Sequence, residues 1–191
     1  DVYKRQTVSY TGLFDDVAAD AWYAPAVDYV KYGRIMNGMG SNRFQPNTQM
    51  TRAMFAQVLY ALEGSPSVSG LSCPLTDAGG SWYTDAVIWA YNAGVVAGVS
   101  PTRFAPNEAL TREQMVTMLY GYAGREQAPS GSDGALAGYQ DQARVSTWAR
   151  EAMAWAVGTG VIAGTSATTL APRKTGTRAE VATVLMRFCE Q

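Results

Sequence analysis

The sequence TREQMVTMLY, residues 111–120, decides the fold because two similar segments accompany it in the chain. It returns as TRAMFAQVLY at residues 51–60 and as TRAEVATVLM at residues 177–186. In each copy a Thr-Arg pair precedes apolar residues at helical spacing, which predicts an amphipathic helix that begins at the threonine. Self-similar segments that recur along a chain in this way are typical of repeat proteins.

Other residues recur in the same register as the Thr-Arg pair. A first helix is expected to begin near a tryptophan, with Trp82, Ala86, Trp89 and Ala90 on one face in the second copy, and to end near Gly94. A loop containing glycine and proline then leads to the second helix. The predicted fold class is therefore all-α, with three helix–loop–helix repeats. In order along each copy, the recurring residues are Trp22, Gly38 and Pro46, then Trp82, Gly98 and Pro106, and finally Trp148, Gly164 and Pro172.

The three repeats are expected to span residues 11–64, 71–124 and 136–191, and linkers rich in Gly, Ser and Pro separate them. Residues 1–10 fit nothing downstream and are interpreted as a leader or cloning scar outside the domain, and a start without Met indicates a fragment. Two short helices cannot bury their apolar stripes alone, so the repeats are expected to pack together. Closure about a pseudo-threefold axis is favoured, because a linear stack without polar caps would leave two open ends.

The composition excludes several functions. The 191 residues include 15 Lys and Arg, 16 Asp and Glu, and no His. Without a basic surplus, nucleic acid is not an expected partner, and without His the commonest general base and metal ligand are absent. We expect no enzyme activity, cofactor, metal or membrane insertion. Cys73 and Cys189 form no C-x-x-C motif and are either one disulfide or two buried thiols, of which the thiols are favoured.

The motifs carry a resemblance when they are read in order. Trp82-Tyr83, Gly-Val-Val-Ala-Gly at 94–98, Phe-Ala-Pro-Asn at 104–107 and Thr111-Arg112, each with counterparts in the other copies, resemble S-layer homology domains from about Phe14 to Phe188. The resemblance implies a monomeric pseudo-trimer that attaches surface proteins to the secondary cell wall polysaccharide of Gram-positive bacteria. It also implies an extracellular location and a pyruvylated amino sugar as ligand, bound in grooves between repeats. A helical protein–protein scaffold on the cell surface is the alternative.

Four kinds of residue in each repeat are candidates for ligand binding. The arginine either forms a salt bridge to an aspartate or, as we favour, grips a ligand carboxylate with help from backbone N–H groups at the helix start. The tryptophan is either core or a platform for sugar rings, and the glycine either permits a turn or admits a ligand to bare backbone. The candidates are Asp16, Trp22, Gly38, Arg52, Asp77, Trp82, Gly98, Arg112, Asp141, Trp148, Gly164 and Arg178.

The first copy departs most from the pattern. Thr177 with Glu180 forms a capping-box sequence and Gln114 can replace the acid, but Met54 cannot. In the register of Gly94 and Gly160 the first copy has Arg34. The first copy is therefore expected to bind ligand most weakly, so that Arg52 should matter less than Arg112 or Arg178.

Overall fold

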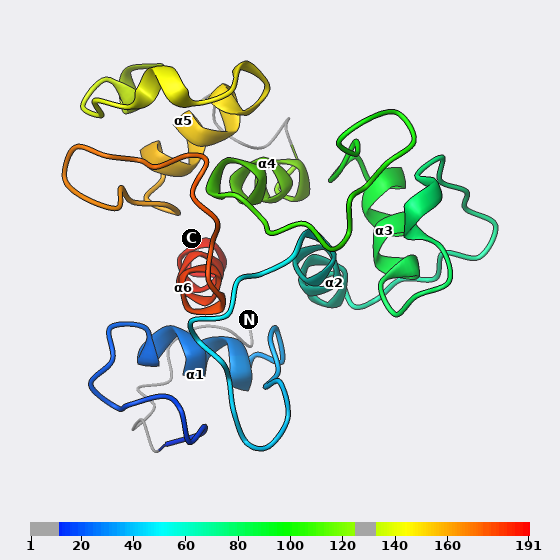
Figure 1. The fold of residues 1–191 in the computed structure, drawn as a ribbon, viewed down its shortest axis with the longest axis horizontal. Helices are drawn as coiled ribbons and strands as arrows, with labels where there is room; N and C mark the ends of the chain where they lie inside the picture. The colour runs from blue at the N-terminus through cyan, green and yellow to red at the C-terminus, as the bar shows by residue number, and fades with distance from the viewer. Residues whose placement is uncertain (1–11, 125–132) are drawn as a thin grey trace. The chain divides into compact units, whose positions relative to one another are not determined.

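The computed structural model describes residues 12–124 and 133–191, and the regular secondary structure in that part of the chain is helical (Figure 1). One helix–loop–helix per repeat is present, as predicted, and the all-α class is confirmed. The first helices of the repeats are α1 (Ala24–Tyr32), α3 (Thr84–Asn92) and α5 (Arg150–Gly158), and the second helices are α2 (Arg52–Leu62), α4 (Arg112–Tyr122) and α6 (Arg178–Cys189). Short 3-10 helices precede some of them: η1 (Thr76–Ala78), η2 (Asp133–Leu136), η3 (Gln142–Arg144) and η4 (Thr147–Ala149).

The three second helices begin where the repeated Thr-Arg pair predicts. The preceding threonine caps each helix, because its hydroxyl accepts the N–H of the third helical residue. In α4 and α6 the side chains of Gln114 and Glu180 accept a hydrogen bond from the threonine N–H, which completes a capping box. Met54 offers no such acceptor in α2, so the predicted loss of the capping box in the first copy is confirmed.

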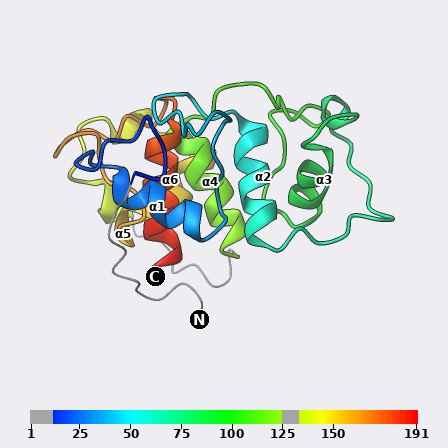
Figure 2. The ribbon, with the colours of Figure 1, turned by 90° about the horizontal axis from the view of Figure 1, so that it is seen from below.

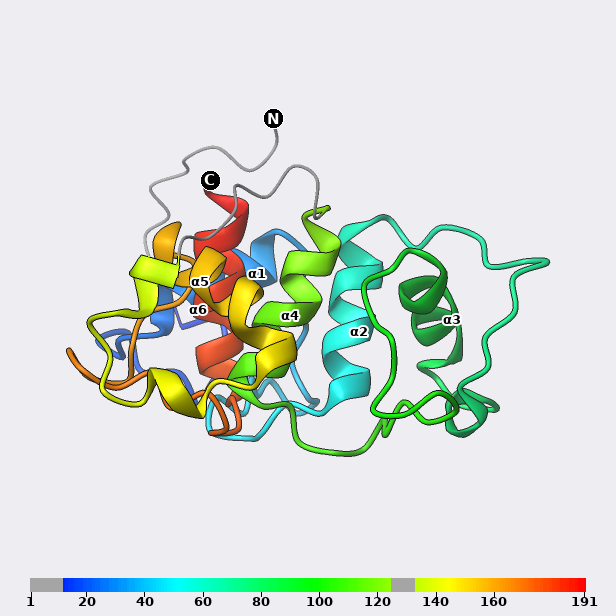
Figure 3. The same cartoon turned by 90° about the horizontal axis from the view of Figure 1, so that it is seen from above.

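The second helices pack against first helices of other repeats. The chain divides into two compact units, one made of Gly176–Gln191 with the described part of Asp1–Met50, the other of Thr51–Thr175. In the first unit α6 packs on α1 (Figure 2), and in the second unit α2 packs on α3 and α4 on α5 (Figure 3). Repeat one thus pairs with two, two with three, and three with one. The pseudo-threefold axis stays a prediction.

The tryptophans of the first helices separate into two environments. Trp89 and Trp155 are buried with 8% and 3% exposure, as predicted, and each contacts a tyrosine of a second helix. Trp82 does not share their face. It lies before α3, which begins only at Thr84, and its side chain is 62% exposed. The prediction that Trp82 belongs to the apolar stripe of α3 was therefore wrong.

Both cysteines are free thiols, as the favoured interpretation has it, but each is half-buried and not buried as expected. Burial and the charge of Glu190 raise the pKa of Cys189 to about 11, so its thiol is protonated at neutral pH. Within residues 12–124 and 133–191, none of the helices is both long and apolar enough for a bilayer crossing.

Candidate functional site

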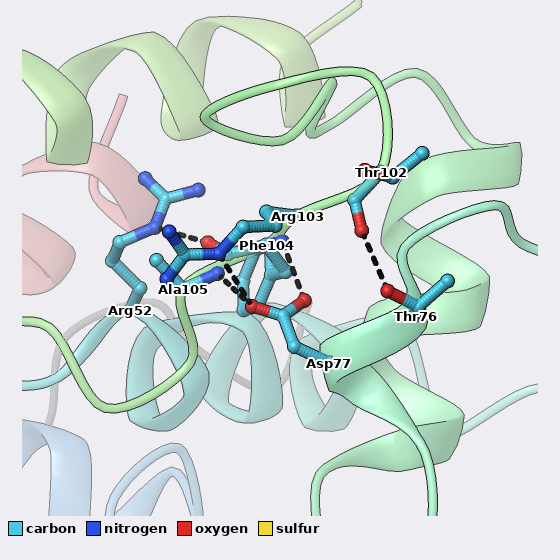
Figure 4. Close-up of polar contacts among 7 residues, drawn as sticks. All are labelled: Arg52, Thr76, Asp77, Thr102, Arg103, Phe104 and Ala105. Carbon is cyan, nitrogen blue, oxygen red and sulfur yellow. Dashed lines mark hydrogen bonds and ion pairs between the residues drawn. The ribbon is translucent and has the colours of Figure 1, made fainter.

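An aspartate holds the loop of each repeat. Asp77 accepts the backbone N–H groups of Phe104 and Ala105 at 2.7 and 2.8 Å, one on each carboxylate oxygen (Figure 4). Burial raises the pKa of Asp77, but the backbone hydrogen bonds and the charge of Arg103 together outweigh it, so the pKa lies below its ordinary value. The other two repeats have the same arrangement at 2.8 Å, with Asp16 on Phe44 and Gln45, and Asp141 on Leu170 and Ala171.

The arginine of the Thr-Arg pair binds the loop of a different repeat. Arg52 Nε donates to the carbonyl oxygen of Phe104 at 2.8 Å, and the side chain is only 5% exposed. The aspartate of one repeat and the arginine of another therefore hold the N–H and the C=O of the same loop residue. The counterparts of the arginine contact are Arg112 Nε to Leu170 O at 3.0 Å and Arg178 Nε to Phe44 O at 2.7 Å.

The aspartates act on the arginines across repeats. The charges of Glu108 and then of Asp77, both in repeat two, raise the pKa of Arg52, and the charge of Asp16 in repeat one raises that of Arg178. In both arginines burial outweighs this effect, so the pKa is lowered overall. The carboxylates accept hydrogen bonds from loop N–H groups, so aspartate and arginine are joined through the loop backbone. Within the described residues, neither Asp77 with Arg52 nor Asp16 with Arg178 forms the direct salt bridge that the sequence left open as the alternative to ligand binding.

Further contacts fix the guanidinium groups. Arg52 and Arg178 lie over the phenylalanine ring whose carbonyl they bind, with Cζ 4.7 and 4.5 Å from the centroid. Arg112 Nη2 donates to Ala163 O at 2.5 Å, and Arg178 Nη2 donates to Asn37 O at 2.7 Å. These bonds explain why a cation occupies the first helical position, where the helix dipole disfavours it.

The N–H groups at the helix starts are already bonded. The N–H of Arg52 donates to Glu108 O and that of Ala53 to Pro106 O, each at 3.0 Å. The expectation that free helix-start N–H groups help to bind a ligand carboxylate was therefore wrong, because loop carbonyls of another repeat have taken them. In α4 and α6 the N–H groups of Arg112, Glu113, Arg178 and Ala179 donate to the carbonyls of Lys174, Pro172, Thr48 and Pro46.

The repeated glycines are explained by close packing. A Cβ on Gly98 would lie 2.7 Å from the carbonyl oxygen of Arg103 and from the Leu75 side chain. A Cβ on Gly38 would lie 2.7 Å from the Phe14 ring, and one on Gly164 would meet two loop carbonyls. Of the three, Gly98 alone has a positive φ, 87°. The turn alternative thus holds for Gly98, whereas Gly38 and Gly164 need only the absence of a side chain.

A strained backbone residue follows each clamped loop residue. Gln45, Ala105 and Ala171 adopt left-handed φ angles of 57°, 59° and 51°, and each directly precedes a proline. This conformation costs a non-glycine residue about 1–2 kcal/mol. The aspartate accepts the N–H of the strained residue, and the arginine binds the carbonyl just before it. The loop is therefore held in a conformation that it would not adopt by itself.

One large aromatic surface per repeat faces solvent. Trp22, Trp82 and Trp148 are 65%, 62% and 57% exposed, so the core alternative for them was wrong. Trp22 and Trp82 each make an edge contact with the following tyrosine, at centroid distances of 5.3 and 5.1 Å. An exposed indole offers a flat apolar face, on which the C–H groups of a sugar ring can pack.

The structure also bears on the ranking of the copies. Arg34 lies in the first repeat, whose loop is bound by Arg178 and not by Arg52. The two departures of the first copy, Arg34 and Met54, therefore affect different loops, and they give no common reason for Arg52 to be the weakest.

Sequence reasoning missed one charged loop residue. Arg103 lies 3.9 Å from Asp77 through Nε, and its side chain is 62% exposed. The signal that could have found it is an arginine at the same loop position in two copies, Arg43 and Arg103. It was overlooked because the third copy has Thr169 there.

Comparison with known proteins gives three matches to one family model, the S-layer homology domain, at residues 13–56, 74–116 and 138–182. An amylopullulanase of Thermoanaerobacterium thermosulfurigenes is 29% identical over 95% of this chain and 10% of its own length. An S-layer protein of Bacillus thuringiensis subsp. finitimus is 26% identical over 93% of this chain and 21% of its own. A surface-layer 125 kDa protein of Lysinibacillus sphaericus is 32% identical over 82% and 13%. The chain thus spans a tenth to a fifth of these relatives.

Proposed function

The chain belongs to the S-layer homology domain family, and on this basis we propose that it binds a secondary cell wall polysaccharide through its three loops and exposed tryptophans. Family membership and the surface-layer relatives make it a cell-surface anchoring module of Gram-positive bacteria. It is an anchoring module rather than a catalytic one, since the enzymes that it matches share only this part of their length.

The observation that carries the proposal is the exposed tryptophan of each repeat. Trp22, Trp82 and Trp148 are the most exposed large apolar side chains in the described part of the chain, and they occupy equivalent positions. A buried indole would stabilise the fold by roughly 25 cal/mol for each Å² of apolar area removed from water. The three exposed tryptophans do not contribute this stabilisation, and their equivalent positions support a role in binding rather than in folding.

The ligand that we propose is a pyruvylated amino sugar. Pyruvate attached as a ketal adds one carboxylate to a ring that otherwise offers C–H faces, hydroxyls and an amide. The chain offers partners for both parts, because the exposed indoles that precede the first helices can pack on the ring and the guanidinium groups at the loops can bind the carboxylate. The buried arginines also hold the loops together, so a part of Arg52 in ligand binding rests on its Nη groups, for which residues 12–124 and 133–191 provide no hydrogen-bond partner.

A cell-wall pull-down tests the proposal. We expect the chain to sediment with purified Gram-positive walls and to lose this behaviour after the secondary polymer has been extracted while peptidoglycan remains. Replacing Trp22, Trp82 and Trp148 together by alanine should abolish sedimentation without changing the helical circular dichroism. As a matched control, Tyr32→Ala removes another aromatic that is 54% exposed, and it should sediment like the wild type. Sedimentation with extracted walls would reject the secondary polymer as the ligand and would indicate binding to the remaining peptidoglycan or to a wall-bound protein.

A further inference from the structure

We propose that Arg103, together with Arg52, forms a two-guanidinium subsite for a carboxylate on the loop of repeat two, and that Arg103 determines the anion preference of that loop. The inference rests on the proposed function, because the subsite would belong to the glycan-binding surface. It differs from the general expectation for the Thr-Arg arginines, since it concerns one repeat and a residue outside that pair.

The guanidinium of Arg52 has N–H groups left over. Arg112 and Arg178 each use Nε and Nη2 on loop carbonyls. Arg52 uses Nε on Phe104 O, and within residues 12–124 and 133–191 its Nη groups have no hydrogen-bond partner. The side chain is nonetheless only 5% exposed, and this burial desolvates the charge and lowers its pKa. A buried cation with unused donors is the kind of group that a carboxylate stabilises.

Arg103 brings a second guanidinium to the same loop residue. It directly precedes Phe104, whose N–H is bound by Asp77 and whose C=O is bound by Arg52. Figure 4 shows Arg52 reaching the loop from α2 and Arg103 from the loop itself, with both guanidinium groups on the side away from Thr76. The Arg103 side chain is 62% exposed and its contact with Asp77 is a long one at 3.9 Å, so its Nη groups can meet a ligand.

The charge balance at this loop makes Arg103 decisive. Two acids, Glu108 and Asp77, act on Arg52. Without Arg103, these two carboxylates and the Arg52 guanidinium would have a net charge of −1. Arg103 brings this balance to zero, which removes the net repulsion that a ligand carboxylate would otherwise meet.

The equivalent positions in the other repeats show which residue can replace Arg103 without disturbing the loop. The residue equivalent to Arg103 is Arg43 in repeat one and Thr169 in repeat three. Thr169 directly precedes Leu170, which Asp141 and Arg112 bind as Asp77 and Arg52 bind Phe104. The loop therefore folds without an arginine there, so Arg103→Thr is a substitution that the fold already accepts.

The experiment uses the whole chain and reads each repeat separately. The probe is a synthetic methyl glycoside of an N-acetylated amino sugar that carries a pyruvate ketal, together with the methyl ester of its carboxylate. Titrations are followed by NMR through the indole N–H signals of Trp22, Trp82 and Trp148, assigned with Trp→Phe variants. Wild type, Arg103→Thr and the matched control Arg43→Thr are compared, with circular dichroism to verify folding.

We expect Arg103→Thr to raise the dissociation constant reported by Trp82 about three- to tenfold, with less than about a twofold change at Trp22 and Trp148. Arg43→Thr should leave the Trp82 value unchanged, and the methyl ester should bind wild type and Arg103→Thr equally weakly at Trp82. An unchanged Trp82 value in Arg103→Thr, or an equal loss with the ester, would overturn the subsite while glycan binding stands. Shifts at no tryptophan in the wild type would overturn the proposed function as well.

Discussion

Asp77 and Arg52 hold opposite ends of one residue, because Asp77 accepts the N–H of Phe104 at 2.7 Å and Arg52 donates to its C=O at 2.8 Å. The two side chains come from different repeats and meet only through this loop residue. A change in the conformation of this loop therefore also changes the packing between the two repeats. The same relationship joins Asp141 with Arg112 and Asp16 with Arg178.

Removing the loop clamp should destabilise the fold. Asp77→Ala leaves the N–H groups of Phe104 and Ala105 without their acceptor and frees a strained backbone, so we expect a loss of about 2–4 kcal/mol in the free energy of unfolding. Urea unfolding monitored by circular dichroism measures it. Asp15→Ala is the control, since the Asp15 side chain accepts an exposed hydrogen bond from Asn42, and it should cost less than about 0.5 kcal/mol. Equal losses in both variants would contradict the clamp.

Replacing Arg34 by glycine should stabilise the protein. Arg34 has a φ of 56°, in the register where Gly94 and Gly160 have 71° and 76°. Arg34→Gly relieves a left-handed arginine, and we expect a gain of about 1 kcal/mol. In the reverse substitution Gly94→Ala the new Cβ would meet no atom within 4 Å, so a loss of similar size would come from the backbone conformation alone. Differential scanning calorimetry compares the two, and a lower melting temperature for Arg34→Gly would refute the idea.

The missing capping box of α2 can be restored. Met54→Glu places an acceptor in the first turn after Thr51, as Glu180 stands after Thr177, and adds a negative charge there. We expect a gain of about 0.5–1 kcal/mol in the stability of the chain to urea. Glu180→Met performs the opposite change at the equivalent position of α6 and should lose a similar amount. If both substitutions shift stability in the same direction, the capping explanation fails.

Acid should weaken the loops through their aspartates. Burial raises the pKa of Asp77 and of Asp141, but the backbone hydrogen bonds, together with the charges of Arg103 and Arg144, hold both values below the ordinary one. Their stabilisation is therefore fully present above the unfolded pKa of about 3.9 and is lost as the pH falls through the lower folded pKa values. Urea midpoints measured between about pH 5 and pH 2 should fall less steeply for Asp77→Asn with Asp141→Asn than for the wild type. Identical slopes would show that other carboxyls govern acid unfolding.

The repeat pattern allowed the fold class to be predicted. It did not predict the hydrogen-bond partners that one repeat finds in another. Thr51, Thr111 and Thr177 indicate helix starts through short-range chemistry, so the caps and even the defect at Met54 were predictable. The acceptor of Arg52 was not, because a backbone carbonyl has no sequence signal and Phe104 lies 52 residues away. Trp82 was wrongly assigned to the helix because its spacing from Ala86 and Trp89 is helical, although α3 begins only at Thr84.

Each second helix packs on the first helix of another repeat, and this pairing decides which segments can be exchanged between related proteins without breaking helix contacts. A segment cut at the sequence repeats, such as 71–124, would separate α3 from its packing partner α2 and α4 from α5. A segment cut at the threonines, from Thr51 to Leu110, carries α2, α3 and the loop that Arg52 binds as one piece. Chimaeras between modules of this kind should therefore be joined at the Thr-Arg pairs, where recombination leaves every helix with its native neighbour.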